Sequence, residues 1–84
     1  MINDNSIEIP DYIFKAELYF LGETRFADIA VFQSNRKTPI YCAWLNEEKI
    51  WVEKSNEIWV LLSSGIETIL SKEIGRAIEK EKII

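Results

Sequence analysis

The side chains best suited to covalent or acid–base chemistry are the Cys42 thiol and the adjacent carboxylates of Glu47 and Glu48. A nucleophilic thiol needs an imidazole or another cation beside it, and the sequence contains no histidine. Cys42 is flanked by Tyr41 and Ala43, which favours a small buried hydrophobe over a redox-sensing thiol. Neighbouring glutamates diverge on a strand or turn, so Glu47 and Glu48 are typical of an exposed loop tip. We therefore expect no catalytic residue and no enzyme activity.

Bound metals and cofactors are not expected either. One cysteine without histidine cannot supply the usual four ligands of a zinc site, and it excludes an intramolecular disulfide. The three glycines, Gly22, Gly65 and Gly75, are too far apart to form a phosphate-binding loop.

Two of the three tryptophans lie in a predicted hairpin. Residues 49–53 and 57–62 are expected to pair around a three-residue loop, 54–56, in which the asparagine takes the left-handed conformation. This loop length places Trp51 opposite Trp59 on one side of the hairpin. The aliphatic side chains of the two strands then point toward the core.

Charged residues share the predicted face of these tryptophans. The expected partner-binding residues are Trp51, Trp59, Lys49, Glu53 and Glu57. An aromatic cluster rimmed by charge is typical of a protein-recognition hot spot. Tryptophans can equally enlarge the core of a small domain, and we expect this for Trp44, which lies in the most apolar segment. The register sets Glu53 against Glu57, a repulsive pair, so another loop length stays open.

Strand patterns precede this hairpin. Apolar residues alternate over 12–20, which predicts a half-buried strand that ends at a turn formed by Gly22 and the two residues after it. Residues 25–33 are predicted as a strand from their β-branched and aromatic content, although their spacing also fits a helix. A strand over 40–45 follows Pro39; both of its faces are apolar, so it should be central in the sheet.

The C-terminal part has a helical pattern. Ser64 and Glu67 have the spacing of a reciprocal helix N-terminal cap. Apolar residues then recur on one stripe: Ile66, Ile69, Leu70, Ile74, Ala77 and Ile78. Gly75 is unfavourable inside a helix, which indicates close approach of the helix to the sheet at that position.

These elements predict an α+β fold. We expect a four- to five-stranded antiparallel β-meander, open or curled into a barrel-like form, followed by one C-terminal amphipathic helix. The chain should form a single domain over 1–84, with a loose lead-in at 1–10, the sheet at 12–63 and the helix at 65–82.

The composition of the chain limits the classes of partner that it could bind. The 84 residues include 10 basic and 14 acidic side chains, a net charge of −4, which makes nucleic acid an unlikely partner. No apolar run is long enough to span a membrane, and the N-terminal residues lack the pattern of a secretion signal, so we expect a cytoplasmic protein. Two apolar sheet faces with one helix to cover them indicate a homodimer that associates through sheet edges or the tryptophan-bearing face.

The function that fits these features is that of a small acidic, non-catalytic protein-binding module. In size and charge it is comparable to antitoxins, immunity proteins and phage-encoded inhibitors. It would act as such an inhibitor or as an accessory subunit, by occluding a surface of its partner. The alternative is a small β-barrel-like domain that binds single-stranded nucleic acid through exposed aromatic residues.

Overall fold

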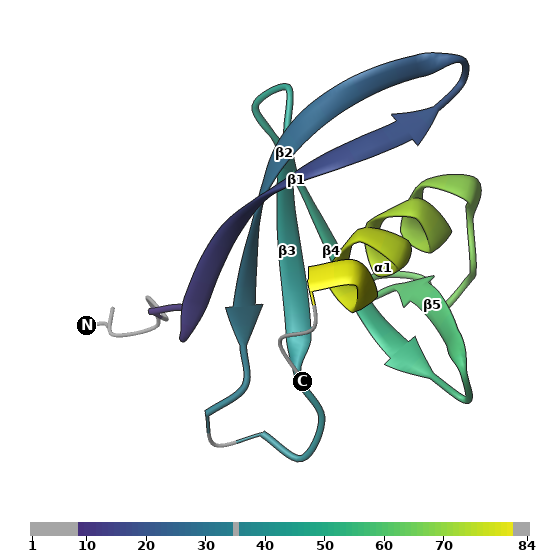
Figure 1. Ribbon diagram of the computed structural model, residues 1–84. Coiled ribbons are helices and arrows are strands. Elements are labelled where there is room, and N and C mark those ends of the chain that lie inside the picture. The colour runs from purple at the N-terminus through teal and green to yellow at the C-terminus, as the bar shows by residue number, and fades with distance from the viewer. Residues whose placement is uncertain (1–8, 35, 82–84) are drawn as a thin grey trace.

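The structure, a computed structural model, describes residues 9–34 and 36–81 and contains five strands and one helix (Figure 1). The elements are β1 (Tyr12–Phe20), β2 (Glu23–Phe32), β3 (Ile40–Leu45), β4 (Glu48–Ser55), β5 (Ile58–Leu61) and α1 (Ile69–Glu81). All neighbouring strands are antiparallel and follow one another in the order β1-β2-β3-β4-β5. The predicted α+β meander with a C-terminal helix is therefore confirmed, in its open form, because the sheet does not close into a barrel.

Three tight turns connect the hairpins of this meander. Each has two residues with positive φ, a geometry whose twist matches that of the flanking strands. The turns lie at Leu21 and Gly22, at Asn46 and Glu47, and at Asn56 and Glu57. Residues 25–32 of the predicted segment 25–33 belong to strand β2, as predicted, and the helical alternative for them is wrong.

The last turn changes the predicted register of the final hairpin. The loop is Asn56 and Glu57, not 54–56, so Trp59 pairs with Lys54. The predicted pairing of Trp51 with Trp59 is wrong. The register differs from the predicted one by an odd number of residues, and side chains alternate between faces along a strand. Trp51 and Trp59 therefore lie on opposite faces of the sheet.

The core lies between one sheet face and α1. From the strands it contains Phe14, Ala16, Leu18, Ala27, Ile29, Val31, Tyr41, Ala43, Leu45, Val52 and Trp59, and from the helix Ile74, Ala77 and Ile78. The alternation predicted for 12–20 is confirmed along most of β1, whose Phe14, Ala16 and Leu18 are buried. Trp44 does not belong to this core: its side chain lies on the other face, and the expectation that it is buried is wrong.

The helix begins at Ile69, four residues after the predicted start. Its N-terminal cap is reciprocal, as predicted, but it is formed by Thr68 and Ser71 rather than by Ser64 and Glu67. The Ser71 amide donates to Thr68 Oγ1 over 3.0 Å, and the Thr68 amide donates to Ser71 Oγ over 2.7 Å. Ser64 Oγ instead accepts the Ile66 amide within the preceding loop, at 3.2 Å.

The later start divides the predicted apolar stripe. Ile74, Ala77 and Ile78 are buried against the sheet and Leu70 is half-buried, whereas Ile66 and Ile69 are exposed. Gly75 lies against the Trp59 ring, which confirms the predicted close approach of helix and sheet.

Helix α1 contacts β1, β4 and β5, so it spans the two edges of the open sheet. At the β1 edge, the Tyr19 amide donates to Glu73 Oε2 over 2.8 Å and Arg76 Nη2 donates to the Glu17 carbonyl over 3.2 Å. These helix side chains satisfy backbone groups that an edge strand would otherwise expose.

Candidate functional site

The structure shows an inert setting for the one cysteine. Cys42 is 5% exposed, and burial, the dominant influence, raises the pKa of its thiol, against smaller opposing effects of Lys49 and of a backbone hydrogen bond from Ile50. A thiol that stays protonated is a weak nucleophile. Within residues 9–34 and 36–81, no three cysteine or acidic side chains gather in a way that could hold a metal ion.

Trp59, one of the predicted binding residues, is a structural residue of the core. Its side chain is 6% exposed and meets the Tyr41 ring edge-on, with 5.3 Å between ring centroids. Its indole Nε1 donates to Glu79 Oε2 over 3.1 Å, and Lys54 Nζ donates to the same oxygen over 2.8 Å. These contacts tie the β4–β5 hairpin to α1 and leave almost no Trp59 surface for a partner.

The other predicted binding residues are only partly brought together. Lys49, Trp51 and Glu53 alternate along β4 and share the face that α1 does not cover. Trp51 packs beside Phe32 on this face, with 5.3 Å between their rings. Glu57 lies apart from them, in the turn before β5.

The same uncovered face carries aromatic residues on four adjacent strands. Strand register places Asp28 beside Trp44, Trp44 beside Lys49, Cys42 beside Trp51, and Glu17 beside Phe26. Residues two positions from a direct partner are diagonal neighbours, about 7 to 8 Å apart, within reach of aromatic rings. Tyr19 on β1, Phe26 on β2, Trp44 on β3 and Trp51 on β4 therefore form a continuous diagonal line, here called the aromatic band.

Three members of the aromatic band are open to solvent. Tyr19 is 61%, Phe26 64% and Trp44 55% exposed, whereas Trp51 is half-buried. An aromatic side chain carries about 150 to 250 Å², so the three exposed rings present roughly 300 to 400 Å² of apolar surface. Ile13, also exposed, lies on the same face of β1, beyond the pair of Lys15 and Asp28. A patch of this size is comparable to the largest apolar patch on a typical monomer, which is often a functional surface.

The charges beside the aromatic band nearly balance. Lys15 Nζ lies 3.1 Å from Asp28 Oδ1, so these two charges pair within the face. Lys49 Nζ lies 5.5 Å from the Trp44 ring centroid, a cation–π distance. Glu17 and Glu53 add two carboxylates, so the cations do not form the positive track that a phosphate backbone follows.

Sequence reasoning missed Tyr19 and Phe26 and assigned Trp44 to the core. The sequence does contain a signal for Tyr19. It follows Lys15 and Glu17 at steps of two residues along β1, so it lies on the same face of the strand as these charged side chains. Trp44 is flanked across the strands by Asp28 and Lys49, which indicates an exposed face. That second signal can be read only once the register is known.

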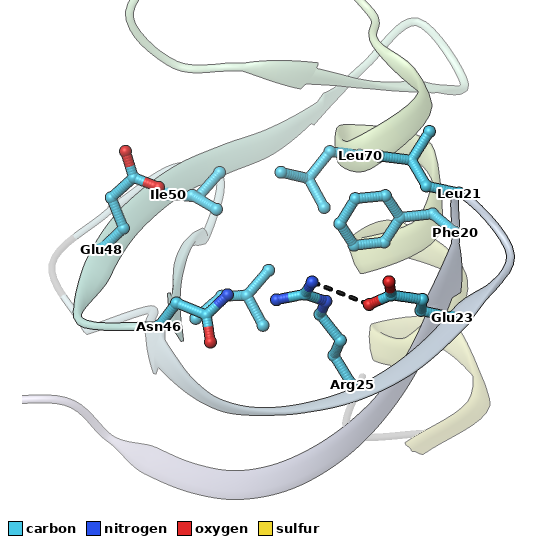
Figure 2. A pocket seen from close by; sticks show the side chains of 9 residues that line it. Phe20, Leu21, Glu23, Arg25, Asn46, Glu48, Ile50 and Leu70 are labelled. Atoms are coloured by element: carbon cyan, nitrogen blue, oxygen red, sulfur yellow. Dashed lines mark hydrogen bonds and ion pairs between the residues drawn. The ribbon is translucent and has the colours of Figure 1, made fainter.

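A hollow of about 330 Å³ lies elsewhere, at the end of the helix-covered face (Figure 2). Its apolar lining is Phe20, Leu21, Leu45, Ile50 and Leu70, and its polar lining is Glu23, Arg25, Asn46 and Glu48. Figure 2 shows the guanidinium of Arg25 directed into the hollow, where its Nη2 donates to Glu23 Oε1 over 2.8 Å. The Arg25 charge is thus balanced inside the hollow, which leaves the site without an excess positive charge for an anion.

Comparisons with protein-family models, with curated proteins and with solved structures found no match to this chain. The part of the chain that the structure describes contains no helix long and apolar enough to cross a membrane.

Proposed function

We propose that this chain is a non-catalytic protein-binding module that docks the surface of another protein molecule through the aromatic band. The observation that carries the proposal is the exposure of Tyr19, Phe26 and Trp44 along one diagonal of the sheet. Rigid aromatic side chains have few rotatable bonds, so they bury a large area at a low cost in conformational entropy. Its mechanism is occlusion of the partner's surface.

This surface differs from the one inferred from sequence. Trp51 and Lys49 remain in it, Tyr19, Phe26 and Trp44 enter it, and the buried Trp59 leaves it. Glu53 contributes a charge at its border. Glu57, in the turn, has no part in this surface.

The alternative, binding of single-stranded nucleic acid, would use the same rings as a stacking platform. It also needs cations along the path of the phosphates. Lys15 is already paired with Asp28, and Glu17 lies directly beside Phe26. The charges near the rings therefore favour a protein surface over a polyanion.

Affinity capture from a lysate of the source organism tests this proposal. The bait proteins are the wild type, the double variant Phe26→Ser/Trp44→Ser, and Ile69→Ser. Ile69 is a matched control because it is exposed and apolar but lies on α1, away from the aromatic band. Proteins bound by the wild type and by Ile69→Ser should be absent from the double variant, and nuclease treatment should not remove them. Capture that survives the double substitution contradicts the proposal, and nuclease-sensitive capture that falls steeply with salt supports the nucleic-acid alternative.

A further inference from the structure

Helix α1 and the loop before it cover one part of the β1 edge and most of the short β5 edge. At β1, the Tyr19 amide and the Glu17 carbonyl bond to Glu73 and Arg76. At β5, the Trp59 carbonyl accepts Ser71 Oγ over 2.8 Å, and the Leu61 amide donates to the Ile66 carbonyl over 3.0 Å. Edges covered in this way are poor templates for strand addition. Along these covered parts, association of two chains would use a face of the sheet rather than an edge.

The aromatic band supplies much of the apolar part of one side of a standard interface. Such an interface takes about 800 Å² from each partner, of which somewhat more than half is apolar. The three exposed rings present roughly 300 to 400 Å² of apolar surface. Bordering polar residues, such as Thr24 and Glu17, supply the remaining polar share.

The charges nearest the rings at the two ends of the aromatic band are opposite, and Glu53 lies farther out, beyond Trp51, at the β4 end. Lys49 lies beside Trp44 at the β4 end, and Glu17 lies beside Phe26 at the β1 end. Lys15 and Asp28, near the middle, neutralise each other. Two molecules can face each other across a two-fold axis that lies between their sheets and runs across the aromatic band between Phe26 and Trp44. This axis places each end of the aromatic band of one molecule against the opposite end of the aromatic band of the other. The β4 end of one molecule, with Lys49, then faces the β1 end of the other, with Glu17.

We infer that the protein surface met by the aromatic band is that of a second copy of this chain, packed face to face about this two-fold axis. The inference rests on the proposed function, whose binding surface it uses. A two-fold interface must be self-complementary, because the same patch is used by both subunits. The apolar centre and the opposite charges at the two ends meet this requirement. Each molecule in the dimer covers the other's exposed rings, with their sheets in the aligned packing common to facing sheets.

Sedimentation equilibrium over low to high micromolar concentration tests the dimer. The wild type should move from a mass of 9.8 kDa toward twice that value. Phe26→Ser and Trp44→Ser should remain monomeric over the same range, while the control Ile69→Ser should dimerise like the wild type. A wild type that stays monomeric, or a dimer indifferent to both substitutions in the aromatic band, overturns the inference.

A charge-exchange experiment tests the two-fold arrangement. Lys49→Glu alone and Glu17→Lys alone place like charges at both ends of the dimer, so each should weaken association by about fivefold. In an equimolar mixture, a Lys49→Glu chain and a Glu17→Lys chain form two opposite pairs, which should restore association. Failure of the mixture to associate better than either variant alone contradicts this arrangement.

Controls for folding accompany this experiment, because the Glu17 charge also acts on Arg76. Circular dichroism and urea denaturation should show that each variant monomer is folded. The outcomes also separate the inference from the proposed function. A wild-type monomer that still captures a protein through Phe26 and Trp44 overturns only the dimer. A wild-type monomer whose captured proteins are all retained by the double variant overturns both.

Discussion

The ring of Trp59 lies so close to Gly75 that a Cβ on Gly75 would stand well within 3.0 Å of Cγ of Trp59. Real Cβ contacts essentially never fall below 3.0 Å. Gly75 therefore allows α1 to approach the sheet over the Trp59 ring. Glycine weakens a helix locally, but the packing of α1 against the sheet requires it at this position. The same approach lets the Trp59 indole reach Glu79 one turn later.

Gly75→Ala should destabilise the protein, although alanine is the better helix former by about 1 kcal/mol. The added methyl group would displace the Trp59 ring, and overpacking of this kind typically costs about 1 to 3 kcal/mol. Urea denaturation of the two proteins measures the difference. In a Trp59→Leu background the ring is absent, so the same substitution should cost less; an equal cost in both backgrounds would show that the ring is not the cause.

The final hairpin shows which part of the fold could be predicted from sequence. The strands and their order follow from apolar alternation and turn residues, and they are confirmed. The loop length was wrong because the second turn position is occupied by Glu57, at φ 73°, where glycine is the usual signal. This change in loop length moved Trp59 from the predicted binding face into the core.

The candidate site was less predictable than the fold, because it depends on register across four strands. Trp44 lies in a strand whose Tyr41, Cys42 and Ala43 are all buried, so its local sequence indicates core. Its exposure follows from its position beside Asp28 and Lys49, which no local pattern reveals. Phe26 likewise joins the aromatic band only through the antiparallel pairing of β1, β2 and β3.

The apolar stripe of α1 predicts unequal costs of truncation to alanine. Ile74 is fully buried, so Ile74→Ala should cost about 2 to 5 kcal/mol. Leu70→Ala should cost less, because Leu70 is half-buried and borders the hollow. Ile69, 68% exposed, is the matched control, and Ile69→Ala should change stability by no more than about 0.5 kcal/mol. Urea denaturation checks the order, and a larger loss at Ile69 than at Ile74 would mean that the helix is rotated.

The position of the helix start predicts that two substitutions near it destabilise the protein to different extents. Thr68→Ala removes the oxygen that accepts the Ser71 amide, so it should cost about 1 kcal/mol. Ser64→Ala removes only a hydrogen bond within an exposed loop and should cost a few tenths of that amount. Thermal unfolding of both variants tests the assignment. A greater loss in Ser64→Ala would place the start of the helix at the position first expected from sequence.

Acid should weaken the protein through the carboxylate that joins α1 to the edge of β1. Hydrogen bonds from Arg76 lower the pKa of Glu73 below its ordinary value of 4.5, and the Tyr19 amide contributes in the same direction against the opposing effect of burial. A folded-state pKa below the unfolded value gives a stabilisation that is fully present above the unfolded pKa. That stabilisation is lost as the pH falls from about 5 through 4.5 and below, where Glu73 becomes protonated.

Glu73→Gln removes this titration while keeping the shape of the side chain. At pH 7 the variant should be less stable by about 1 to 2 kcal/mol, because hydrogen bonds from Arg76 and the Tyr19 amide to a charged acceptor are lost. The gap should narrow as the pH falls below 4.5, and it should close below the lowered folded-state pKa of Glu73, where the wild-type carboxylate is neutral as well. Free energies of unfolding from urea titrations at a series of pH values give the gap directly. A gap that stays constant between neutral and acidic pH would show that the Glu73 carboxylate does not stabilise the contact between α1 and β1 through its charge.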